Sequence, residues 1–377
     1  MPRSEAKDLP VGLRRWNRLS LARRFAIAQR IVRFRLPQWV KTHSGVVSAG
    51  VGHKLTRTPA QKRAARRLAA QITRRKAPKR SRGPIPWTLG TVKRDQICIR
   101  FVMEHKWTGT DPANNAEDPE RIPSLIHTTT VIRGRRVRVS IPTDVDQHAT
   151  GAVQAALDAT DGIRVISSVN ANNRCLGSFC CVVRNRQKPS ERYLLSCHHV
   201  LTLSANSPTF SPVGRADVRT RIPDVSSGEL FDFATLGDGT DFGCDAALAE
   251  LTVPDDPEIW GVAPTGIAGA FDRPTSLSVL VPRQNPTSSR RIAPIPAAFI
   301  DVQFGQLIPF NNNVAVRFEA VVRYRAETVE GDSGSAVIGS DGTLYGMHFY
   351  EFHNGIACAI PAYILFRPGL FSINIKL

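Results

Sequence analysis

The sequence predicts a mainly β protein: a β-rich C-terminal domain forming a sandwich or a pair of barrels, preceded by a small α+β module and a basic helical N-terminal region. Three observations predict this organisation. Short apolar runs alternate with Gly, Pro, Asn and Asp after residue 164. Three further β-like runs lie within residues 84–145. Residues 1–83 hold 23 Lys and Arg against two acidic residues. A chain of 377 residues has room for these parts as separate domains.

The N-terminal region, residues 1–83, contains two stretches with helical spacing. In residues 20–37 apolar side chains recur on one face between arginines, and Pro37 is expected to end the helix. The apolar positions are Leu21, Phe25, Ala28 and Val32. Residues 58–83 are rich in alanine, lysine and arginine and predict a second cationic helix.

The net charge of +18 is concentrated in that region, since the rest of the chain is slightly acidic. Such a segment attracts an anionic partner: nucleic acid, anionic lipid or an acidic protein. The alternative is a solvated tail, because no base-reading motif accompanies the charge. No apolar run is long enough for a transmembrane segment or a secretory signal. Seven cysteines without a CxxC pair favour reduced thiols, and we expect a cytoplasmic protein without cofactor or metal.

The α+β module is predicted over residues 84–145. Its β-like runs are residues 96–103, 125–132 and 135–142, separated by a polar loop rich in turn formers. A linker, residues 146–163, follows. Within it the stretch "TGAVQAALDAT", which begins at residue 150, predicts a short helix.

The C-terminal domain, residues 164–377, carries a possible nucleophile in "GDSGS". A Gly-Asp-Ser-Gly turn can be purely structural, because these residues tolerate tight turns. A serine hydroxyl becomes a nucleophile when a histidine accepts its proton and a buried carboxylate orients that histidine. "YLLSCHHVLTL" supplies His199 after an apolar strand, and "FGCDAALAEL" supplies Asp245 at the start of another. His199, Asp245 and Ser333 therefore form a candidate triad.

These motifs resemble the trypsin-like, chymotrypsin-fold serine peptidases. "LLSCHHVLT", "CDAALAEL" and "GDSGS" match the family's histidine, aspartate and serine motifs in order, across about residues 165–365. The separations of 46 and 88 residues are close to the family's triad spacing. Upstream, "VVSAGVGHK" and "ICIRFVMEHK" resemble a bacterial intracellular trypsin-like group that is also similar to plant narrow-leaf proteins. The resemblance implies a chymotrypsin-like double β-barrel.

The same resemblance implies roles for individual residues. Ser333 is expected to attack the scissile carbonyl, His199 to act as the base and Asp245 to hold the imidazole. The backbone N–H groups of Gly331 and Ser333 are expected to form the oxyanion hole. His198 is the other candidate base, and the motif favours His199 because a small aliphatic residue follows it.

Two signals for substrate preference disagree. Glu327, six residues before Ser333, lies near the position where trypsin-like pockets carry an acid for Lys or Arg. His348 matches a histidine that binds acidic side chains in glutamate-specific relatives. The preference therefore stays open at this stage.

The sequence predicts a serine endopeptidase that works through an acyl-enzyme, is intracellular and is regulated or self-processing, with protein or peptide substrates. The alternative is an anion-binding or nucleic-acid-binding scaffold protein on a catalytically silent trypsin-like fold. The complete triad favours the enzyme.

Overall fold

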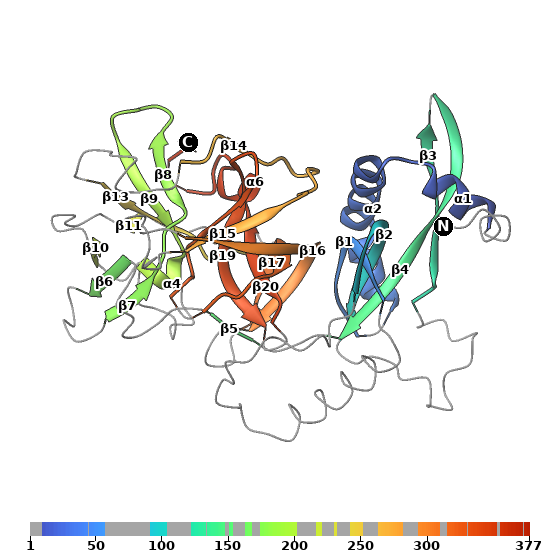
Figure 1. Ribbon diagram of the computed structural model, residues 1–377, viewed down its shortest axis with the longest axis horizontal. Coiled ribbons are helices and arrows are strands. Elements are labelled where there is room, and N and C mark those ends of the chain that lie inside the picture. The colour runs from blue at the N-terminus through green and yellow to red at the C-terminus, as the bar shows by residue number, and fades with distance from the viewer. Residues whose placement is uncertain are drawn as a thin grey trace, which may run out of the picture. The chain divides into compact units, whose positions relative to one another are not determined.

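A computed structural model provides the structure and divides the chain into two compact units, residues 1–148 and 149–377 (Figure 1). The structure describes residues 10–43, 45–56, 91–103, 122–132, 134–147, 151–153, 163–167, 174–201, 216–220, 230–231, 242–251, 263–281, 293–309, 315–329, 331–352, 355–371 and 373–377. It is mainly β, as predicted. Among these residues no helix combines the length and apolarity needed to cross a membrane.

The described residues of the first unit form four strands and two helices. Its elements are α1 (Val11–Asn17), α2 (Leu21–Thr42), β1 (Val46–Thr56), β2 (Thr91–Met103), β3 (Leu125–Ile132) and β4 (Arg135–Gln147). The strand order is β1-β2-β4-β3, with β2 and β4 parallel and the other two pairs antiparallel. α2 packs on β1 and β2, and α1 on β4. Because β1 pairs with β2, the structure joins parts of the chain that the sequence analysis divided between residues 83 and 84.

Helix α2 carries the expected apolar stripe. Phe25, Ala28 and Val32 are fully buried. Pro37 does not end the helix, which continues to Thr42, so that part of the prediction is wrong. The physical reason lies in the next turn, where Trp39 is buried and packs edge-on against Phe101, with ring centroids 5.0 Å apart. This contact offsets the backbone hydrogen bond that a proline cannot make. The second predicted helix, residues 58–83, lies outside the described residues.

The second unit contains a ring of six antiparallel strands. The ring runs β15-β16-β17-β20-β19-β18 and returns to β15. Its strands are β15 (Leu277–Val281), β16 (Ala293–Pro309), β17 (Ala315–Arg325), β18 (Ala336–Gly339), β19 (Thr343–Phe352) and β20 (Ala357–Pro361). Alternate side chains fill the centre of such a ring, and Val279, Val321 and Met347 are fully buried. Two short parallel pairings extend it, β12 (Phe242–Gly243) on β17 and β14 (Gly266–Ile267) on β19.

The strands of two further sheets come before the ring in the chain, except for β21, which follows it. One has five strands in the order β11-β13-β9-β8-β21, and the other has three in the order β10-β6-β7. Their strands are β6 (Ile163–Ser167), β7 (Arg174–Gly177), β8 (Cys181–Asn185), β9 (Arg192–Ser196), β10 (Ala216–Thr220), β11 (Leu230–Phe231), β13 (Ala247–Glu250) and β21 (Ile375–Lys376). Two single-turn helices, α4 (His198–Leu201) and α6 (Ala362–Leu365), follow β9 and β20.

The stretch predicted as a short helix begins instead as a strand, β5 (Gly151–Val153). β5 pairs antiparallel with Tyr350–Phe352 of β19. The helix prediction is wrong for these residues because the pairing with a distant strand outweighs the local helix propensity of alanine. The rest of the predicted helix lies outside the described residues.

Candidate active site

Strand pairing brings His199 next to Asp245. β9 ends at Ser196, and a single turn of helix then carries His199; β13 begins two residues after Asp245, and its Ala247 lies opposite Ser196. One carboxylate oxygen of Asp245 lies 2.5 Å from Nδ1 of His199, and the other accepts the backbone N–H of His199 at 3.0 Å. The carboxylate therefore fixes both the ring and the backbone of the histidine.

The electrostatics of this pair define the tautomer of His199. Asp245 is completely buried, which by itself raises its pKa, but the attraction of His199 and its hydrogen bonds outweigh burial and leave the pKa below its ordinary value. Asp245 is thus ionised at neutral pH and acts as an acceptor. An acceptor beside Nδ1 favours the tautomer of the neutral imidazole with its proton on Nδ1, in which Nε2 has the acceptor lone pair that a general base needs.

His198 has a different environment from its neighbour. It is buried, and its pKa is lowered to about 4: burial lowers the pKa most, the charge of Asp245 raises it, and His199 lowers it by a smaller amount. His198 is therefore neutral at pH 7. The hydrogen bonds to the Asp245 carboxylate come from His199, the histidine that the sequence motif favoured.

The Ser333 turn is closed by the side chain of Asp332. Its carboxylate accepts the backbone N–H of Val329 at 2.7 Å, and its carbonyl accepts the N–H of Ser335 at 3.0 Å. Gly331 adopts a φ of 96°, in the left-handed region that favours glycine. These two hydrogen bonds and the φ of Gly331 fix the backbone conformation of the turn around Ser333.

Gly334 allows the turn to approach the segment before β8. Its φ is 97°, and a Cβ there would lie 2.1 Å from the carbonyl oxygen of Ser178. The backbone N–H of Ser178 donates to the carbonyl of Ser333 at 2.6 Å, and the Ser196 hydroxyl donates to the carbonyl of Ser178 at the same distance. The serine turn is therefore tied to the end of β9, which leads directly to His199.

A second set of contacts ties both the serine turn and the residue after β9 to β19. The backbone N–H of Gly334 donates to the carbonyl of His348 at 2.7 Å, and the Cys197 thiol donates to that carbonyl at 3.4 Å. The Ser333 hydroxyl donates to the carbonyl of Phe349 at 3.2 Å. Ser333 is fully buried and His199 is 1% exposed, so the site is closed to solvent in this structure.

The two candidate specificity residues have contrasting positions. Glu327 is exposed, whereas His348 is fully buried. Nδ1 of His348 lies 2.7 Å from the Tyr324 hydroxyl, and the Cys358 backbone makes a further hydrogen bond. Burial, and then the charge of His199, lower the pKa of His348 to about 3. His348 is thus neutral at pH 7 and offers no positive charge to an acidic substrate.

One carboxylate near the serine turn was missed by the sequence analysis. Glu351 in β19 is partly buried, and its Oε2 accepts the Thr328 hydroxyl at 2.7 Å. Thr328 lies five residues before Ser333, so the hydrogen bond joins the serine segment to β19. No motif pointed to Glu351, because its position depends on the pairing of strands distant in sequence.

Cys197, His199 and Asp245 offer possible metal-ligand atoms that lie within 4.8 Å of one another. His199 and Asp245 are hydrogen-bonded to each other through two of these atoms, and the Cys197 thiol donates to the carbonyl of His348. These hydrogen bonds therefore explain why the three side chains lie close together.

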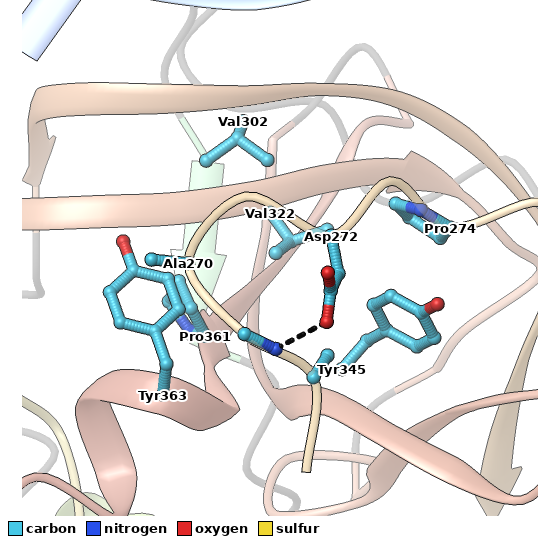
Figure 2. A pocket seen from close by; sticks show the side chains of 10 residues that line it. Ala270, Asp272, Pro274, Val302, Val322, Tyr345, Pro361 and Tyr363 are labelled. Atoms are coloured by element: carbon cyan, nitrogen blue, oxygen red, sulfur yellow. Dashed lines mark hydrogen bonds between the residues drawn. The ribbon is translucent and has the colours of Figure 1, made fainter. Parts of the chain in front are cut away.

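A small pocket lies elsewhere in the second unit (Figure 2). Tyr345, Tyr363 and Asp272 are among its lining residues, and the Asp272 carboxylate accepts the backbone N–H of Gly269 at 2.7 Å. None of the three candidate triad residues lines it. The pocket is therefore distinct from the His199–Asp245 pair.

Comparison with known proteins gives low similarity. No family model matches the chain, and no curated protein does. Among solved structures, the active form of the Rv3671c protease from M. tuberculosis is 16% identical, with a TM-score of 0.35, over 56% of this chain and 79% of that chain. The inactive form of the same protease is 15% identical, with a TM-score of 0.32, over 53% and 82%. Similarity at this level supports no conclusion about function. The functional proposal below is therefore based on the geometry of the site.

Proposed function

We propose that this chain is a serine endopeptidase in which Ser333, His199 and Asp245 form the catalytic triad. The observation that carries the proposal is the Asp245 carboxylate, which is buried and accepts both the ring and the backbone N–H of His199. A carboxylate in this position sets the histidine tautomer needed to deprotonate a serine. The serine turn is hydrogen-bonded to the segment that ends at this histidine.

The proposed reaction follows from these groups. Nε2 of His199 takes the proton from Ser333 as Oγ attacks the scissile carbonyl carbon. The backbone N–H groups of Gly331 and Ser333 stabilise the resulting oxyanion, and each such donor lowers the barrier by roughly 3 kcal/mol. His199 then donates its proton to the leaving amine, and an acyl-enzyme forms on Ser333. Water, deprotonated by His199, attacks the ester and releases the acid product.

The proposed fold is a chymotrypsin-like double β-barrel. The six-stranded ring would be one barrel, and the strands of the other two sheets would belong to the second. In this proposed arrangement the histidine and aspartate would lie on one barrel and the serine on the other, as the chain order of the motifs implies.

The proposal also includes a cytoplasmic location and an anionic partner for residues 1–83. Six of the described cysteines are buried as thiols, a state that a reducing compartment maintains. Helix α2 exposes Arg23, Arg30 and Phe34, the last with 87% of its surface accessible. A cationic face with a protruding aromatic ring suits an anionic surface.

The proposal is tested by the reaction of the purified protein with a fluorophosphonate probe, read by intact mass. We expect one adduct in the wild type and none in Ser333→Ala, and labelling of His199→Ala slowed by at least about a thousandfold because the base is lost. His198→Gln is the matched control and should label at near the wild-type rate. Equal labelling of the wild type and Ser333→Ala would overturn the proposal.

A further inference from the structure

One edge of β19 contacts first β18 and then the serine turn, and this edge extends beyond those contacts to Phe352. β18 pairs with β19 as far as Met347. The serine turn takes the next positions, because the N–H of His348 donates to the carbonyl of Ser335 at 2.8 Å and the N–H of Gly334 donates back to the carbonyl of His348. Phe349 follows, and its carbonyl accepts the Ser333 hydroxyl. Tyr350–Phe352 are therefore the next backbone groups on the nucleophile's side of β19.

Strand β5 occupies these groups. Val153 lies opposite Tyr350, Ala152 opposite Glu351 and Gly151 opposite Phe352 (Figure 1). β20 pairs with Tyr350 and Glu351 on the other edge of β19. Because the pairing with β19 is antiparallel, β5 runs from its N-terminal end towards the side where Ser333 lies.

An extended peptide binds most readily by adding a strand to a sheet edge that offers unpaired backbone groups. To present a carbonyl to Ser333, such a peptide would use the β19 edge beside the serine turn. That edge already holds β5, and both Ser333 and His199 are inaccessible to solvent.

We propose that the chain's own residues 151–153 act as an autoinhibitory strand: they hold the Tyr350–Phe352 edge, which an extended peptide substrate of the proposed peptidase would use, in competition with that substrate. The inference rests on the proposed peptidase function. The partner it implies is an unfolded or extended peptide segment that runs in the direction of β5, and displacement of β5 is the step that opens the site.

The test uses prolines in β5 of the full-length protein. A proline has no N–H to donate. Alternate residues of an antiparallel strand donate to the partner, so Ala152→Pro or Val153→Pro removes a ladder hydrogen bond. The control is Ala152→Ser, which keeps the backbone N–H that Ala152→Pro removes. The measurements are fluorophosphonate labelling rate, kcat/KM for an unstructured peptide added in trans, and amide exchange at Tyr350–Phe352.

We expect at least one strand variant to raise kcat/KM about fivefold or more, the order by which one ladder hydrogen bond shifts an equilibrium. Amide exchange at Tyr350–Phe352 should be faster in that variant, and the control should match the wild type. Labelling with unchanged kcat/KM in both strand variants would overturn the docking inference and leave the peptidase function standing. If none of the proteins were labelled, the wild type included, both the docking inference and the peptidase function would be overturned.

A separate observation concerns substrate selection. Glu351 lies in the middle of this edge, opposite the small side chain of Ala357 on β20, and is held by Thr328. It is two residues beyond Phe349, a spacing of about 7 Å along a strand, which is comparable to the reach of an extended Lys or Arg side chain. We infer that Glu351 selects peptides with a Lys or Arg side chain beside the scissile bond, again on the premise of peptidase function.

This inference is tested with two peptides that differ only in arginine or norleucine before the scissile bond. In Glu351→Gln we expect the arginine preference in kcat/KM to fall about tenfold, because the charge attraction is lost while the amide keeps the side chain's shape. Glu250→Gln, at an exposed acid in β13, should keep the wild-type preference. An unchanged preference in Glu351→Gln, with the norleucine peptide still cleaved, would overturn the assignment without affecting the peptidase proposal.

Discussion

Replacement of Asp245 by Asn is expected to lower kcat by about 10⁴-fold, with a KM within a few-fold of the wild type. The amide keeps the shape of the carboxylate but presents an N–H₂ group towards Nδ1 of His199, where the wild type has an acceptor at 2.5 Å. The ring would then bond through the other tautomer, with Nδ1 as acceptor and the proton on Nε2. A histidine in that state cannot deprotonate Ser333.

Steady-state kinetics on an unstructured peptide measure this effect. Asp272→Asn is the matched control, because its carboxylate also accepts a backbone N–H, that of Gly269, but lies in the separate pocket. The control should keep the wild-type kcat. A loss below about tenfold in Asp245→Asn, with an unchanged unfolding midpoint, would show that the carboxylate does not orient the catalytic base.

Replacement of Arg323 by Met is expected to lower the free energy of unfolding by about 3 to 5 kcal/mol. Arg323 in β17 lies opposite Asp301 in β16, and the guanidinium contacts both carboxylate oxygens, at 2.7 and 2.6 Å. Asp301 is completely buried and Arg323 is 4% exposed. Removal of the arginine leaves a buried carboxylate with only the Gln303 amide as a neutral donor among the hydrogen bonds described.

Denaturant unfolding of three variants tests this result. The double variant Asp301→Leu, Arg323→Met should recover most of the lost stability, because both charges are then absent from the interior. Lys188→Met, which breaks an exposed pair with Glu191, should leave the unfolding midpoint unchanged. Arg323→Met as stable as the wild type would show that the buried Asp301 carboxylate does not depend on the arginine for compensation of its charge.

The local pattern of side chains predicted much of the secondary structure. The short apolar runs after residue 164 include strands that the structure contains, such as β15 and β17, and the stripe that includes Phe25 and Val32 marks helix α2. Errors arose where a distant contact overrode local preference. Trp39 packs on Phe101 and holds the helix beyond Pro37, and β19 holds Gly151–Val153 as a strand.

For the candidate site, the sequence by itself determined the chemical groups: a serine in a glycine turn, a histidine after an apolar strand and an aspartate before another, in triad order and spacing. Only the tertiary structure decided which histidine Asp245 holds, that His348 is buried and neutral, that Glu351 reaches Thr328 and that β5 lies on the edge of β19. The physical reason is that side-chain chemistry and short-range periodicity are properties of neighbouring residues, whereas burial, pKa and strand register depend on pairings between segments up to about 200 residues apart in the chain.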